Sequence, residues 1–223
     1  MSNSFLKFQK KVYSCRKCTR LVKFRNQIVK KKRKSYEDQK YWGKPVSGFG
    51  DVNAKIVLVG LAPAAHGATR TGRVFTGDKS ANFLFKCLHQ SRLANQPNSD
   101  HLNDGLQLKN IFITLALRCV PPQDKPKPEE LKNCSNYFKE ELFLLKNKKI
   151  IIALGKIAFD ACIRFYKQNF NISGSYKFGH GLKYKINDII LLGCYHPSPR
   201  NVNTRRINEK MMIDLFNKAK KLG

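Results

Sequence analysis

The stretch AKIVLVGL, residues 54–61, is a short aliphatic run without the polar alternation of a half-exposed strand. Similar runs follow as NIFITLAL (110–117), KKIIIALG (148–155) and NDIILLGC (187–194). Runs of this kind are typical of parallel strands that are buried on both faces. Helix-like segments lie between and after them, at 79–91, 127–147, 156–168 and 205–223. This alternation predicts an α/β fold with three layers, α/β/α, around a parallel sheet.

The charge of the chain is strongly positive. Lys and Arg number 43 against 15 Asp and Glu, which gives a formal net charge of +28. Such a surface attracts polyanions. We therefore expect nucleic acid as the first partner to consider and an anionic membrane surface as the second. A general preference for lysine inflates the charge, but it does not explain why acidic residues are so scarce.

The length and the apolar content indicate one globular domain. The chain has 223 residues, of which 42% are hydrophobic, enough for a single α/β core. We expect a basic N-terminal arm over 1–50 and an α/β core over 51–223. No apolar run approaches the ~20 residues that cross a bilayer. The N-terminus also lacks the apolar core of a signal peptide, so we expect a cytoplasmic protein.

The unusual residues collect where the expected strands end. The first strand is followed by GLAPAAHGATRTGRVFTGD (60–78), a loop rich in Gly and Ala, and the last is followed by HPSPRN (196–201). The second strand runs into LRCVPP (117–122). Ligands of open α/β sheets bind beyond the carboxyl ends of the strands. The sequence therefore predicts a binding site at this edge of the sheet.

Four of the seven cysteines suggest a metal site. Cys87, Cys162 and Cys194 lie in apolar surroundings and are interpreted as core residues, and the odd count without a signal peptide argues against disulfides. The other four lie among Lys and Arg, and two of them form a C-x-x-C pair; they are Cys15, Cys18, Cys119 and Cys134. Four thiolates can hold a zinc ion or an iron–sulfur cluster. The alternative is a chance C-x-x-C pair with two core cysteines.

The loops at 60–78, LRCVPP and CYHPSPRNVNTRR (194–206) together resemble the type-B iron–sulfur uracil-DNA glycosylases, also called family five. The resemblance runs from the first cysteine pair into the last helix. It implies a four-stranded parallel sheet, removal of deaminated bases from DNA, and a structural 4Fe-4S cluster on the four cysteines. The residues alone leave zinc open as the alternative.

The resemblance also implies how this chain replaces a missing catalytic group. Related glycosylases carry a water-activating Asp or Asn just after the first strand, where this chain has Ala64 and Ala65. Asp78, at the end of the loop, is then expected to place water or to stabilise positive charge on the sugar. Its alternative role is to cap the helix at 79–91, since Asp is a favoured capping residue. Both roles are compatible.

The base pocket is expected to stabilise the departing base. The resemblance assigns His196 as a hydrogen-bond donor to the base, with Asn201 nearby, and Phe75 as the aromatic residue that stacks on it. Backbone amides of the first loop can add donors, at Gly60, Leu61, Ala62 and Ala65. Stabilising the anionic base is the main catalytic need once the base has been flipped out of the duplex.

Contacts with the DNA backbone are expected from the same two loops. Ser198 and Arg200 can hold phosphates, on a loop that two prolines stiffen. His66, Arg70 and Arg73 can contact the base or phosphates. Arg205 stands where the family tends to have Gly, and it adds a charge near the expected DNA face.

One departure from the family bears on the choice of base. The family usually has an Asn at the position of Leu115, and that Asn reads the Watson–Crick edge of uracil. Leucine cannot form hydrogen bonds, so we hypothesise reduced or altered uracil activity, with preference moved toward bases such as hypoxanthine. A competing interpretation is a metal-stabilised nucleic-acid-binding protein without glycosylase activity. In either case we expect a monomer.

Overall fold

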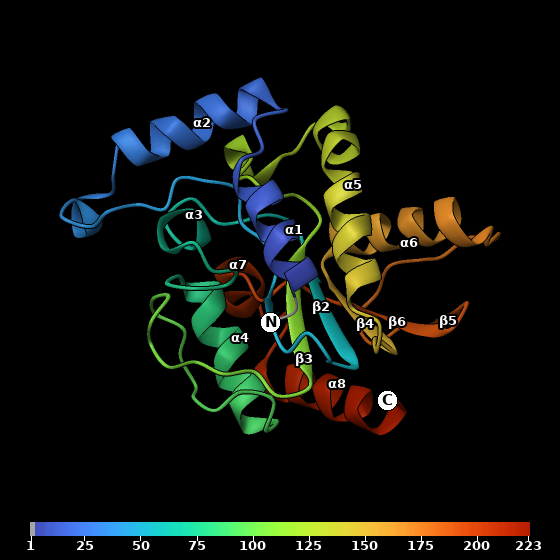
Figure 1. The fold of residues 1–223 in the computed structure, drawn as a ribbon. Helices are drawn as coiled ribbons and strands as arrows, with labels where there is room; N and C mark the ends of the chain where they lie inside the picture. Colours follow the sequence, from blue (N-terminus) through green and yellow to red (C-terminus); the bar gives the residue numbers. More distant parts are fainter. Residues whose placement is uncertain (1–2) are drawn as a thin grey trace.

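The computed structural model describes residues 3–223 (Figure 1). Its strands are β1 (Phe49–Gly50), β2 (Ile56–Gly60), β3 (Ile111–Leu115), β4 (Ile150–Leu154), β5 (Lys183–Ile186) and β6 (Ile189–Cys194). Its α-helices are α1 (Asn3–Tyr13), α2 (Thr19–Lys30), α3 (Ala68–Thr71), α4 (Lys79–Gln90), α5 (Pro128–Leu144), α6 (Lys156–Phe170), α7 (Pro199–Asn203) and α8 (Glu209–Leu222). Short 3-10 turns lie at Lys34–Tyr36 and Pro122–Asp124. None of the helices described has the length and apolar character needed to cross a membrane.

The sheet has six strands in the order β1-β3-β2-β4-β6-β5. Its four central strands are parallel, and they are the four aliphatic runs of the sequence. The edge strands β1 and β5 pair antiparallel with β3 and β6 and extend the expected four strands to six. Neither edge strand has an aliphatic run, because β1 is two residues long and β5 reads KYKI with exposed lysines.

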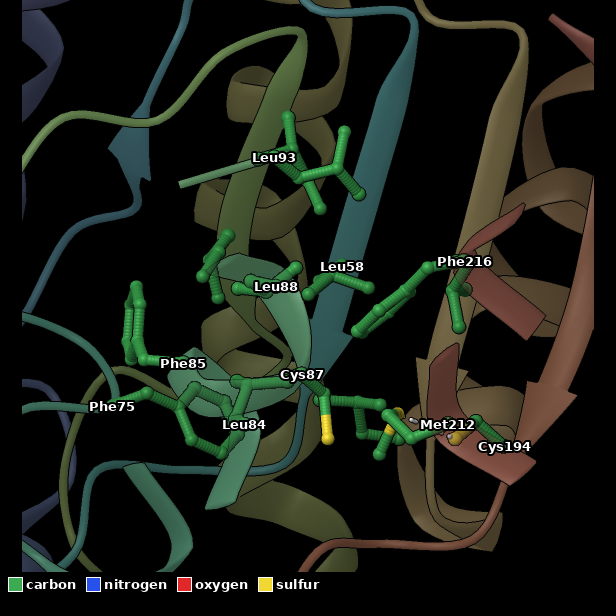
Figure 2. Packing of buried hydrophobic residues seen from close by; sticks show 14 of the residues in the cluster. Leu58, Phe75, Leu84, Phe85, Cys87, Leu88, Leu93, Cys194, Met212 and Phe216 are labelled. Atoms are coloured by element: carbon green, nitrogen blue, oxygen red, sulfur yellow. Dashed lines mark hydrogen bonds between the residues drawn. The ribbon is translucent and has the colours of Figure 1, made fainter. Parts of the chain in front are cut away.

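Each face of the sheet carries its own core, which makes three layers. On one face α4 and α8 cover alternate strand residues such as Ile56 and Leu58. The residues between them, such as Val57 and Val59, face α1, α5 and α6. Figure 2 shows part of the first core, which extends from Phe75 to the α8 side. Burial on both faces explains why these strands lack polar alternation.

The N-terminal arm is folded against the core. Phe5, Phe8 and Val12 are buried at helical spacing on α1, and α1 packs against α5 (Figure 1). Leu21 and Arg25 are the buried residues of α2. The basic arm over 1–50 therefore exposes its lysines to solvent, and the apolar stripe of α1 belongs to the second core. High lysine content concealed that stripe in the sequence.

Candidate active site

A cavity of about 330 Å³ lies beyond the carboxyl ends of β2, β3 and β6. This is the edge where open α/β sheets bind ligands. Its walls come from both strand-end loops, from the end of β3 and from the loop after β3. The lining residues are Leu61, Ala62, Pro63, Ala64, Phe75, Asp78, Ser80, Leu115, Asp124, His196, Ser198 and Pro199.

Asp78 both caps a helix and lines the cavity. Its Oδ1 accepts a hydrogen bond of 3.0 Å from the backbone N–H of Ala81, so it is the N-cap of α4. Its other oxygen packs on Gly67, where an added Cβ would lie 2.0 Å from Oδ2. Burial raises the pKa of the carboxyl, while the amides of Ala81 and Ser80 and the charge of Arg70 oppose the rise. The cap leaves this side chain fixed beside the cavity.

His196 and Phe75 form an aromatic wall. Their ring centroids are 6.0 Å apart with an interplanar angle of 32°. Burial lowers the pKa of His196 to about 4, because the imidazolium loses its hydration there. The ring is therefore neutral near pH 7 and can donate one N–H hydrogen bond. Phe75 has φ +46, a left-handed backbone uncommon for a bulky residue and typical of functional sites.

Asn201 and Ser198 hold the loop that carries His196. The Asn201 side-chain amide donates a 2.8 Å hydrogen bond to the carbonyl of His196. Ser198 is the N-cap of α7, and its hydroxyl accepts from the backbone N–H of Asn201. Ser198 lines the cavity, whereas Asn201 lies behind the loop and is not among the lining residues. The geometry gives Asn201 a positioning role toward His196.

Leu115 makes one wall of the cavity apolar. It is 2% exposed at the end of β3, beside Gly60 of β2 in the parallel ladder. A Cβ on Gly60 would lie 2.9 Å from Leu115 Cδ2 and 3.0 Å from Phe75 Cε2. Gly60 is thus needed for close packing of these two side chains, although it does not itself line the cavity. No hydrogen bond to a base can come from the Leu115 side chain.

Arg70 and Arg73 are structural, which corrects the expectation that they contact DNA. Arg70 is 8% exposed and donates to the carbonyls of His66 (2.7 Å) and Gly77 (2.9 Å). Arg73 is 3% exposed and forms a buried ion pair of 2.5 Å with Asp104. Buried guanidinium groups need such partners, and these contacts hold both side chains inside the protein. Both arginines brace the first loop and thereby the segment that ends in Asp78.

The remaining loop residues lie around the cavity or away from it. His66 hydrogen-bonds with the Tyr41 hydroxyl at 2.9 Å through Nδ1, and neither it nor Ala65 lines the cavity. Arg200 and Arg205 are exposed on and after α7, where cations can meet phosphate. Arg205 has φ +55, the left-handed conformation that glycine adopts without cost. This explains why glycine suits the position.

Asp124 is a lining residue that the sequence reasoning missed. It is exposed, and it comes from the proline-rich loop between Cys119 and Cys134. Both Gln123 and Asp124 have a left-handed backbone, with φ +55 and +56. The only signal in the sequence was a carboxylate in a stiff loop after a strand end. The loop between Cys119 and Cys134 therefore also contributes a residue to the cavity wall.

The four cysteines lie around one small cavity of about 20 Å³ between α2, α5 and the end of β3. They are Cys15, Cys18, Cys119 and Cys134. All are free thiols. Three receive N–H hydrogen bonds: Cys119 from Arg25 (3.0 Å), Cys134 from the backbone of Arg118 (3.3 Å) and Cys18 from Asn133 (3.7 Å). Donors directed at sulfur are typical of thiolates that hold a metal or cluster.

The donor set can be tested for its fit to a metal group. Within residues 3–223, no three His, Cys, Asp or Glu side chains approach closely enough to enclose one ion. A 4Fe-4S cluster binds each thiolate through a different iron, so its four sulfurs need not converge on one point. Arg25 adds a buried positive charge beside Cys119. Four thiols and a buried cation fit an anionic cluster.

Comparisons with known proteins agree with this site. The model of the uracil DNA glycosylase superfamily matches residues 47–220. The type-5 uracil-DNA glycosylase of Thermus thermophilus is 40% identical over 217 residues, 97% of both chains. That of Mycobacterium tuberculosis is 43% identical over 94% of this chain and 78% of the relative, and that of Pyrobaculum aerophilum is 39% identical over 95% and 90%. The chain therefore belongs to the uracil-DNA glycosylase superfamily, as its strand-end loops indicate.

Proposed function

We propose that the protein is a DNA glycosylase that removes uracil from DNA by hydrolysing the N-glycosidic bond. The observation that carries this proposal is the convergence of Asp78, His196 and Phe75 on one cavity of about 330 Å³. Relatives about 40% identical over nearly the whole chain are named type-5 uracil-DNA glycosylases. A flipped-out base is the ligand that such a cavity would take.

Each of three cavity residues has its own role in breaking the N-glycosidic bond. As the bond from C1′ to the base breaks, its electron pair leaves with the base and positive charge builds on the sugar. A neutral His196 donates a hydrogen bond to the base and stabilises its negative charge. The Asp78 carboxylate stabilises the cationic sugar and orients the water whose oxygen joins C1′. The proton that this water releases balances the negative charge of the departing base, which leaves in its neutral form. Phe75 stacks on the extruded base.

The four cysteines would hold a 4Fe-4S cluster, whose contribution is a structural cross-link. It would join the start of α2, through Cys15 and Cys18, to the loop and helix that carry Cys119 and Cys134. Asp124 lies on the same loop and lines the base cavity. A brown colour and bound iron in the purified protein would support the cluster, and a colourless protein with bound zinc would contradict it.

The partner of this site is DNA that contains a deaminated base, bound by one copy of the protein. The net charge of +28 supplies the general attraction, and the exposed Arg200 and Arg205 supply cations near the cavity. Ser198 lines the cavity mouth on the same loop. We expect the protein to act where DNA is found, in the cytoplasm and on the nucleoid.

The apolar wall at Leu115 bears on the range of bases. A buried leucine does not discriminate the Watson–Crick edge by hydrogen bonding, so the cavity is expected to accept hypoxanthine as well as uracil. A panel of duplexes with uracil, hypoxanthine and xanthine, cleaved by alkali at abasic sites, measures this range. Activity on uracil alone would contradict the broader range but not the glycosylase function.

Asp78 offers a matched test of the glycosylase function. Asp78→Asn keeps an oxygen that can accept the Ala81 N–H but removes the charge, whereas Asp78→Ala removes both. We expect both variants to lose about 100-fold or more in single-turnover rate on uracil-containing DNA. Only Asp78→Ala should also lose about 1 kcal/mol of stability. A wild-type holoprotein that binds this DNA but leaves every base attached would instead support the binding protein without catalysis.

A further inference from the structure

Arg25 is a buried cation without a carboxylate partner. Its side chain is on the inner face of α2, and the residue is 4% exposed. Of the other buried arginines, Arg73 and Arg118 pair with Asp104 and Glu141. Arg70 has no acid partner, but its guanidinium donates to three oxygen atoms. No ion pair of Arg25 with an acid is found in the part of the chain that the structure describes. An uncompensated buried charge is costly, so an anion is expected beside it.

The one hydrogen-bond partner found for the guanidinium among residues 3–223 is the Cys119 sulfur. Nη1 of Arg25 donates to Sγ at 3.0 Å. The Nε–H is buried and has no partner within the described residues. A neutral thiol is a weak acceptor and brings no negative charge. A thiolate bound to iron supplies both the acceptor and the charge that this buried group lacks.

The position of Arg25 follows from the start of α2. The helix begins at Thr19, directly after Cys18, and Leu21 and Arg25 are four residues apart on its buried face. Leu21 lines the small cavity that the four cysteines share. One helix thus presents a cysteine at its start, an apolar side chain one turn later and a cation after a second turn. Cys18 and Leu21 line that cavity, and Arg25, four residues after Leu21 on the same helix face, reaches it through its hydrogen bond to the Cys119 sulfur.

We propose that Arg25 is the counter-ion of the cluster that the four cysteines would hold, and that it acts through a hydrogen bond to the Cys119 thiolate. It is a positioning residue, and its role rests on the proposed cluster. A positive charge and an N–H donor at a ligand sulfur favour the more reduced, more negative state of a cluster. Arg25 therefore raises the reduction potential of the cluster and slows its loss.

The test compares holoproteins that differ at one residue of α2. Arg25→Met removes the charge and the donor but keeps an unbranched side chain that fills the space. Arg25→Lys keeps the charge and loses the fork of N–H groups. Lys23→Gln removes one charge from the exposed face of the same helix and is the matched control. Reduction potential is measured by voltammetry, and cluster loss by the decay of visible absorbance in the presence of an iron chelator.

We expect Arg25→Met to shift the redox equilibrium about tenfold toward the oxidised form, about 59 mV for a one-electron couple. Cluster loss should be about tenfold faster, as for a lost charge-assisted hydrogen bond. Arg25→Lys should lie between the wild type and Arg25→Met, and Lys23→Gln should match the wild type.

An Arg25→Met holoprotein with wild-type potential and lifetime would overturn the proposal, as would an equal shift in Lys23→Gln. If Arg25→Met does not fold, Arg25→Lys decides, and an unshifted potential there overturns it. A wild-type protein that never contains iron would contradict the proposed cluster itself, which is a different result from a contradiction of the role of Arg25. If the wild type contains iron and the variants have its potential and cluster lifetime, only the role of Arg25 is contradicted.

Discussion

The stability of the protein should depend on pH through His196. Burial lowers the pKa of this imidazole to about 4, from the ordinary histidine value of about 6.5. Below about pH 6.5 His196 is protonated in the unfolded chain but stays neutral in the folded chain. The free energy of unfolding therefore falls as pH falls. Between about pH 7.5 and pH 5 the loss amounts to about 2 kcal/mol, and it approaches about 3 kcal/mol below pH 4.

The measurement uses His196→Gln, which keeps an N–H donor but does not titrate. Urea denaturation of both proteins across this pH range gives two stability curves, and their difference isolates the histidine from other titrating groups. We expect the wild type to lose about 2 kcal/mol more than the variant between about pH 7.5 and pH 5. Protonation of His196 should not change the glycosylase rate in the same range, because the folded imidazole stays neutral. Parallel stability curves would show that His196 is hydrated and that its assigned neutral state is wrong.

Other substitutions test the remaining parts of the site. Gly67→Ala would place a Cβ 2.0 Å from Asp78 Oδ2, so the carboxylate must move, and we expect a loss of about 100-fold in single-turnover rate. Leu115→Asn should raise activity on uracil relative to hypoxanthine; unchanged relative rates would refute a role for Leu115 in base choice. Arg73→Gln should cost about 3–5 kcal/mol of stability, because it leaves Asp104 unpaired. Arg200→Gln should change the free energy of unfolding by no more than about 0.5 kcal/mol. It should weaken DNA binding and lower the salt dependence of binding by about one ion. A loss of stability in Arg200→Gln and a loss of DNA binding alone in Arg73→Gln would show that the roles of Arg73 and Arg200 are exchanged.

The sequence predicted the residues that line the cavity better than the residues that support them from behind. Asp78, His196, Phe75 and Leu115 were expected near the base, and all four line one cavity. Their loops follow strand ends, and parallel topology brings such ends to one edge. Asn201 shares a loop with His196 but holds it from behind. Sequence spacing alone does not separate a side chain that faces a cavity from one that supports the loop.

Charged residues show most clearly what the sequence alone does not predict. Arg70 and Arg73 stand in a loop that follows a strand, which is also where a residue that binds DNA would stand. Their partners, Gln39 and Asp104 among them, are reached only when the chain folds back. Burial decides whether a guanidinium is free for phosphate, and burial depends on segments distant in sequence.

By itself the sequence determined the layers, the four parallel strands and the edge at which the loops meet. These depend on the period of apolar residues, which is a local property of the chain. Only the tertiary structure decided which polar side chains face the cavity, that Asp124 joins it from the cysteine loop, and that Arg25 lies buried against Cys119. Those outcomes depend on contacts between distant segments, because the environment of a charged group is set by whatever packs around it.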